Sequence, residues 1–143
     1  MADTPYALGM NALFEALYNL TGNPPPMKLM LVNIAGGHYV PNFITDQFLS
    51  AIALGDRISS TGALTGVTAS AGSGPKSTFA AANTVFSSVT GAAAGAAVAY
   101  LDTGNPATSP LIWYFDSWSG LPITPDGSDI NVTFSGSGIA VMT

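Results

Sequence analysis

The sequence predicts a mainly β domain, an antiparallel β-sandwich or barrel-like body with an N-terminal helix and one short additional helix. Two observations favour this class. Segments of strand length recur at intervals of roughly 8–15 residues, and glycine, proline and serine fill the spaces between them. The length of 143 residues suits a single domain. We expect the N-terminal helix and a proline linker over 1–26, and a β-rich body over 27–143.

The N-terminal helix is predicted over 11–20. Its apolar residues, among them Phe14 and Leu17, recur at the spacing that places them on one helical face. The prolines at 24–26 cannot continue a helix and are expected to form a short extended linker. The almost continuous apolar run 27–32 that follows has the length of a buried strand.

A loop, a short helix and two strands are predicted next. Glycines and a proline interrupt 33–43, which indicates a loop. Thr45 can cap a short helix over 45–52, with an acidic residue in the first turn. Polar and apolar residues alternate in 56–60 and in 63–70, and this period is typical of half-buried strands.

Further strands are predicted toward the C-terminus. Turn residues separate 94–101 from 111–116, and these two segments are expected to pair. A long turn is expected over 120–129, where proline, aspartate and glycine gather. Apolar and polar residues alternate in 130–134, which predicts a strand with one buried face. The remaining strands are predicted over 84–89 and 139–142.

The chain carries few charges and much apolar surface. Its three strong bases and eight acids make 8% of the residues, where about 25% is usual, and 48% of the residues are hydrophobic. This composition excludes a disordered tail, and a net charge of −5 excludes the basic footprint of a nucleic-acid binder. The absence of cysteine excludes a disulfide scaffold. We expect the excess apolar surface to be buried against other subunits.

We expect neither a membrane span nor a secretion signal in this sequence. The first residues lack the apolar stretch of a secretion signal. The longest apolar stretch, 92–101, has about half of the roughly 20 residues that a membrane helix requires. The expectation is therefore a protein made and assembled in the cytoplasm.

The sequence offers little for catalysis or metal binding. His38 is the only histidine and lies in a predicted loop, so a loop or interface role is favoured over a catalytic one. The segment 125–129 has the residues of a turn but not the ligand spacing of a calcium loop. Pro75 interrupts the pattern that a phosphate-binding loop over 72–78 would need. We expect no enzyme activity, no cofactor and no metal; a hydrolase that depends on His38 is the alternative.

Aromatic residues gather in one segment. On a strand, Trp113 and Phe115 face one way and Tyr114 faces the other, and Trp118 follows closely. Because rings on both faces would overfill a small core, at least one face is expected to meet another subunit, where aromatic anchors concentrate. Burial in the core and a carbohydrate-binding platform are the alternatives.

The order of the segments carries a resemblance. The strongest stretch, 100–129, contains Asp102-Thr103-Gly104, Ala107-Thr108-Ser109-Pro110-Leu111-Ile112, Asp116, Gly120-Leu121-Pro122 and Thr124-Pro125, and looser matches cover 11–20, 27–32, 38–50 and 62–66. In this order the chain resembles a family of small virion structural proteins of tailed bacteriophages. Charged positions of the family's pattern around 94–101 are Ala, Gly and Leu here, which favours burial of that segment in an assembly.

The resemblance implies a capsid cement or decoration protein on the virion head surface, made in the host cytoplasm. Its expected partners are the major capsid protein and further copies of itself, and a trimer would suit threefold capsid positions. Nucleic acid and membranes are not expected partners. The alternatives are a tail or neck component, or a virion-surface receptor- or glycan-binding module. The candidate interface residues are Phe14, Leu17, Tyr39, Trp113, Phe115 and Trp118, and the loops 33–43 and 121–129 are candidate contact arms.

Overall fold

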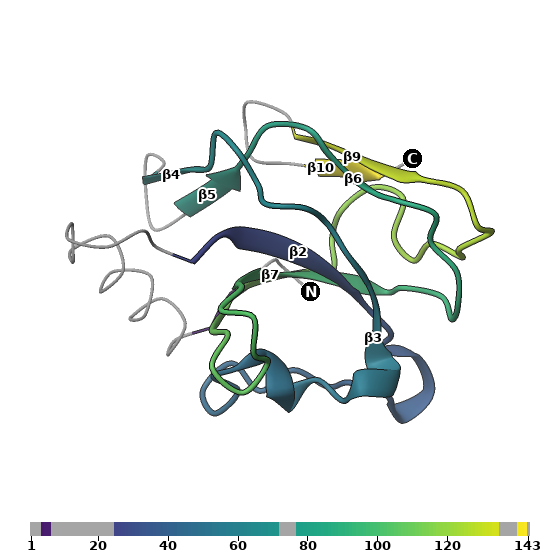
Figure 1. The fold of residues 1–143 in the computed structure, drawn as a ribbon, viewed down its shortest axis with the longest axis horizontal. Coiled ribbons are helices and arrows are strands. Elements are labelled where there is room, and N and C mark those ends of the chain that lie inside the picture. Colours follow the sequence, from purple (N-terminus) through teal and green to yellow (C-terminus); the bar gives the residue numbers. More distant parts are fainter. Residues whose placement is uncertain (1–3, 7–24, 72–76, 135–139, 143) are drawn as a thin grey trace.

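The computed structural model describes residues 4–6, 25–71, 77–134 and 140–142 (Figure 1). The helix predicted over 11–20, with Phe14 and Leu17, lies outside the described residues. The mainly β, antiparallel class predicted from the sequence is confirmed, and no sheet closes into a barrel within the described ranges. The strands are β1 (Thr4–Pro5), β2 (Met27–Val32), β3 (Arg57–Ser60), β4 (Thr68–Ala71), β5 (Ser77–Ala80), β6 (Thr84–Phe86), β7 (Ala96–Leu101), β8 (Leu111–Phe115), β9 (Ile130–Phe134) and β10 (Ala140–Met142).

A five-stranded sheet, in the order β1-β8-β7-β2-β3, forms the middle of the fold. β2 pairs with β7 from Met27↔Leu101 to Val32↔Ala96. β7 also pairs with β8, and this second pairing is the one that the sequence predicts. Every residue of β7 and β8 is buried. This burial explains why the sequences of these strands are almost continuously apolar. A strand covered on both faces has no side on which polar residues would meet water.

A second sheet, in the order β10-β9-β6, covers one face of the central sheet (Figure 1). Apolar side chains of β6 and β9, including Phe86 and Val132, share a buried cluster with Leu29 and Leu31 of β2. The alternating pattern in 130–134 therefore marks a strand with one buried face, as predicted, because Ile130 and Val132 are buried whereas Asn131 and Thr133 are exposed. A separate pair, β4 and β5, completes the described strands.

The segment 33–56 covers the other face of the central sheet, and we refer to it as the loop layer (Figure 1). Its buried side chains, Tyr39, Leu49 and Ile52, pack into a second cluster together with residues of β2, β7 and β8. The layer holds the short 3-10 turns η1 (Ala35–Gly37), η2 (Leu49–Ala51) and η3 (Leu54–Asp56). Its ends meet where the Asn33 amide donates to the carbonyl of Asp56 at 2.9 Å.

The short helix predicted over 45–52 is reduced to the single turn η2, so Thr45 does not cap it. Phe48 precedes η2 with extended backbone angles of −122° and 159°, and it forms an isolated bridge with Pro110. The helix does not form over 45–48 because the bridge to Pro110 holds the backbone of Phe48 extended. The strand predicted over 63–70 likewise begins only at Thr68.

Candidate functional site

The aromatic side chains predicted to meet another subunit are buried within the chain. Trp113 is 6% exposed, Phe115 2% and Trp118 3%. Their rings form one continuous stack, with centroids 6.3 Å apart between Trp113 and Phe115 and 4.3 Å apart between Phe115 and Trp118. The interface prediction for these three residues is therefore corrected, and the core alternative holds in this structure.

The facing strand explains why the rings fit. Trp113 pairs across the sheet with Ala99, and Phe115 pairs with Ala97. All four residues belong to the same cluster, so each large ring occupies the volume that a small partner leaves. The prediction of an overfilled core failed because it counted the rings and not the alanines opposite them.

Tyr39, the remaining interface candidate within the described residues, is also buried and holds the loop layer in place. Its hydroxyl lies 2.7 Å from the hydroxyl of Tyr6 and donates to Asp46 Oδ2 at 2.8 Å. Burial is the largest cause that raises the pKa of the Tyr39 hydroxyl, so it remains protonated and able to donate. This network joins the loop layer to the segment beside β1 and is structural.

His38 lies on the loop layer next to an acid. Its Nδ1 lies 2.6 Å from Asp56 Oδ1, and half of its side chain is exposed. Within the described residues no group of three or more histidine, cysteine, aspartate or glutamate side chains could hold a metal ion. The pair therefore links two parts of the loop layer.

The two acids of the predicted turn 120–129 accept hydrogen bonds from main-chain amides. Asp126 Oδ1 accepts hydrogen bonds from the amide and the hydroxyl of Ser128, and these bonds lower the pKa of Asp126. Asp129 Oδ1 accepts from the Ser88 amide at 2.7 Å. Asp126 therefore fixes the local backbone of the turn, and Asp129 ties the turn to the segment that follows β6.

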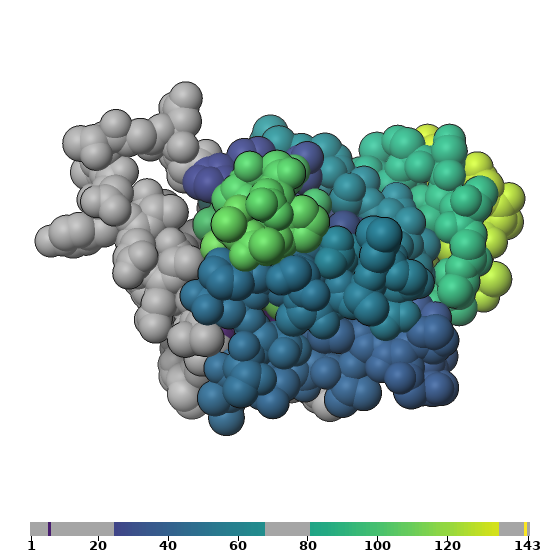
Figure 2. Space-filling model, turned by 60° about the horizontal axis from the view of Figure 1, so that its bottom comes forward, coloured from purple at the N-terminus to yellow at the C-terminus, as the bar shows by residue number. Residues whose placement is uncertain are grey.

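The loop layer carries three exposed large apolar side chains. Val40 is 74% exposed, Ile44 78% and Leu54 79%. Figure 2 shows this layer, coloured blue, across the side of the molecule that comes forward in that view. Val40 falls inside the contact arm predicted over 33–43, and Ile44 follows directly. The predicted contact loop thus presents apolar groups to solvent, although the predicted aromatic anchors do not.

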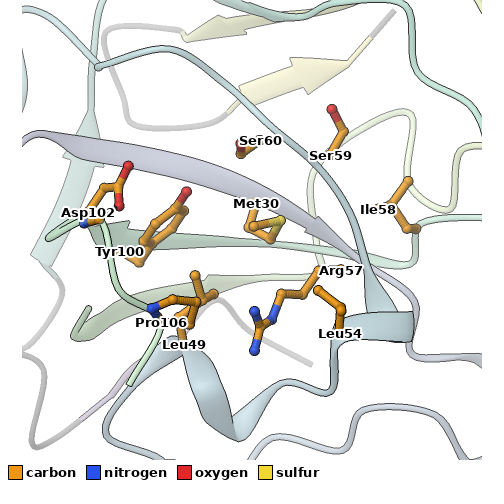
Figure 3. A pocket seen from close by; sticks show the side chains of 11 residues that line it. Met30, Leu49, Leu54, Arg57, Ile58, Ser59, Ser60, Tyr100, Asp102 and Pro106 are labelled. Atoms are coloured by element: carbon orange, nitrogen blue, oxygen red, sulfur yellow. Dashed lines mark hydrogen bonds between the residues drawn. The ribbon is translucent and has the colours of Figure 1, made fainter. Parts of the chain in front are cut away.

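A pocket of about 320 Å³ lies between the loop layer and the turn that follows β7 (Figure 3). Met30 and Tyr100 of the central sheet line it, together with Leu54 of η3 and Arg57 of β3. Arg57 Nε donates to the carbonyl of Ile52 at 2.8 Å, which holds the guanidinium beside the pocket. The pocket thus combines an apolar floor with a half-buried cation.

The second charged group of the pocket is already paired. Asp102 lines the pocket, and its Oδ2 lies 2.6 Å from Lys28 Nζ. This hydrogen bond is the largest cause that lowers the pKa of Asp102, so the carboxylate stays charged near neutral pH. No sequence signal pointed to this pocket, because β3, β7 and the loop layer meet only through the topology of the sheet.

Comparison with known proteins gives no assignment: no family model matches the chain, and no curated protein matches it. Among the residues that the structure describes, no helix has the length and apolar character to cross a membrane.

Proposed function

We propose that this chain is a virion structural protein of a tailed bacteriophage, a capsid cement protein that bridges neighbouring coat subunits on the head. The observation that supports the proposal is the exposure of Val40, Ile44 and Leu54 on the loop layer of a chain with only 8% charged residues. Contact with a neighbouring subunit would remove these apolar groups from water, which is favourable, and few charges would have to be desolvated with them. The resemblance over 100–129 supplies the kind of assembly.

The proposed contact is weak in a single copy. Burial of three aliphatic side chains contributes about 5–9 kcal/mol at most. Association costs about 4–15 kcal/mol in lost freedom of motion, so one copy alone would hold poorly to the shell. Several linked copies that engage the lattice together gain avidity. We therefore propose that the chain acts as a homo-oligomer, and that the loop layers of its copies contact the major capsid protein.

The first test is the location of the protein in purified phage particles. Heads that lack tails should contain the chain in many copies, and isolated tails should contain none. Recovery in tails alone would instead establish the tail or neck alternative. Sedimentation of the purified chain should show an oligomer, and a monomer at high concentration would contradict the avidity argument.

The second test changes the loop layer. The double variant Val40→Lys/Ile44→Lys should reduce the number of copies on the head at least tenfold, because it places two charges at the proposed contact. Asn131→Lys/Thr133→Lys is the matched control, since it adds the same two charges at exposed polar positions of β9, away from the loop layer. Full occupancy by the double variant, with an unchanged melting temperature, would exclude this surface as the capsid contact.

A glycan-binding module is the weaker alternative on structural grounds. The ring that a sugar would stack on, Trp118, is only 3% exposed and packs between Phe115 and Phe134. A sugar cannot reach the ring in this arrangement, so the described structure favours a protein contact over a carbohydrate platform.

A further inference from the structure

β3 is the outer strand of the central sheet. It pairs with β2 on one side, and no strand among the described residues pairs with its other side. The amide of Thr61 donates inward to the carbonyl of Leu29, so the alternation of an antiparallel ladder directs the main-chain groups of Ser60 outward. Ser60 is exposed, which leaves this edge open to a further strand.

The pocket lies directly along this open edge. All four residues of β3 line it, and the side chains of Met30 and Tyr100 form its floor. Leu54 stands at its border and is 79% exposed. Figure 3 shows these side chains around one hollow, with the turn that carries Asp102 and Pro106 on the opposite side. A chain that extended the sheet at β3 would therefore place alternate side chains over the pocket.

Arg57 supplies the charge that defines the occupant. No ion pair joins its guanidinium to a carboxylate of the described residues; Asp56 pairs with His38, and Asp102 pairs with Lys28. Its Nε is fixed by Ile52, so the terminal nitrogens are held at the pocket without a charged partner from the described chain. A half-buried cation gains most from an anion that makes two parallel hydrogen bonds, as a carboxylate does.

We propose that the free edge of β3 and the adjoining pocket bind an extended, acidic segment of a partner protein. The segment adds a strand beside β3, a glutamate or aspartate side chain pairs with Arg57, and a neighbouring apolar side chain covers Met30. Main-chain hydrogen bonds give the affinity, and the carboxylate and the pocket give the specificity. The site is compatible with the virion role but does not depend on it, because the edge, the pocket and the charge of Arg57 are present in the single chain.

The test uses the purified full chain and a display library of random twelve-residue peptides. The enriched peptides should share one acidic residue flanked by apolar or β-branched residues. The affinity of the best peptide is then measured with its glutamate intact and with that glutamate replaced by glutamine. The replacement should weaken binding to the unmodified chain about tenfold, as expected for one charged hydrogen-bonded pair.

Three variants of the chain separate the parts of the proposal. Arg57→Gln should bind the glutamate and glutamine peptides equally, whereas Lys76→Gln, which also removes one positive charge but leaves the Lys28–Asp102 pair intact, should keep the tenfold preference. Ser60→Pro removes an outward amide at the edge and should weaken both peptides at least tenfold. If Ser60→Pro fails to fold, hydrogen exchange of the Ser60 amide in the unmodified chain replaces it, and saturating peptide should slow that exchange at least tenfold.

Several results would overturn the proposal. These are the enrichment of no peptide, a shared motif without an acidic residue, and a glutamate preference that survives in Arg57→Gln. Binding that depends on Arg57 but leaves Ser60→Pro and the Ser60 amide unaffected would show that the pocket takes a free acid and not a strand. A purified oligomer that Ser60→Pro dissociates into monomers would show that the edge is occupied by a second copy of the chain. None of these measurements involves a phage particle, so they fail or succeed separately from the cement function.

Discussion

The pairing of large rings with alanines makes a quantitative prediction for Phe115→Ala. Phe115 is fully buried, stacks on Trp118, and faces Ala97 across the sheet. Neither Ala97 nor Ala99 can extend into the vacated space, so a cavity should remain. Loss of a buried phenylalanine side chain in such a site costs about 3–5 kcal/mol of the free energy of unfolding. Small domains have about 5–15 kcal/mol in total, so the variant should be markedly unstable.

The second variant tests whether Ala97 limits the space. Ala97→Leu alone should overfill the cluster and lower the free energy of unfolding by about 1–3 kcal/mol. In Phe115→Ala/Ala97→Leu the leucine enters the cavity, so the double variant should be more stable than the sum of the single effects by at least about 1 kcal/mol. Ala96→Leu is the control, because Ala96 faces the opposite cluster and should not compensate.

The assay is urea unfolding followed by far-UV circular dichroism, with the denaturant slope compared among variants. Two results would contradict this packing: a loss of less than about 1 kcal/mol in Phe115→Ala, or compensation by Ala96→Leu that equals that of Ala97→Leu. Either result would mean that the ring does not sit in the volume that Ala97 leaves.

Three further predictions concern other parts of the fold. Gly120→Ala should lower the free energy of unfolding by about 2–4 kcal/mol, because Gly120 has a φ of +100° and a Cβ there would overlap the carbonyl oxygen of Met142. Thermal unfolding measures this loss, and an unchanged melting temperature would contradict the close approach. Tyr39→Phe should lower the free energy of unfolding in urea by about 1–3 kcal/mol, because Tyr6 and Asp46 lose a hydrogen-bond partner. A loss no larger than that of an exposed control such as Thr45→Ala would disprove the anchoring role of Tyr39. Asp102→Asn should cost about 0.5 kcal/mol at pH 7. The pKa of Asp102 is lowered and that of Lys28 is raised. The difference should therefore vanish as pH falls through the lowered Asp102 pKa, and also as pH rises through the raised Lys28 pKa. A difference that stays constant through both titrations would exclude the ion pair as its cause.

The sequence predicts the central strands well because their signal is local. The runs 27–32, 94–101 and 111–116 are apolar almost throughout, and the structure places all three side by side, buried on both faces. The short helix was predicted in the wrong form because the bridge between Phe48 and Pro110 joins segments that are far apart in the sequence. A local pattern contains no information on such a pairing.

The surface was predicted less well than the core. The aromatic segment was predicted to meet another subunit because aromatic residues concentrate at interfaces. The alanines that accommodate its rings lie on a different strand, β7, and are not visible in the segment itself. The pocket beside Arg57 was not predicted at all, because a single arginine in a short polar strand gives no local signal. It gains importance only when the sheet places Met30 and Tyr100 beside it.

The two ends of the loop layer lie together, so its exposed residues can change without moving the strands on either side. The chain leaves the central sheet at Asn33 and returns at Asp56, and one hydrogen bond joins these two points. Most of the intervening positions could therefore be rewritten, lengthened or exchanged for another sequence while Tyr39, Leu49 and Ile52 continue to seal the sheet below. In an engineered form, this segment is the natural insertion point for a foreign epitope, because the strands on either side would keep their register.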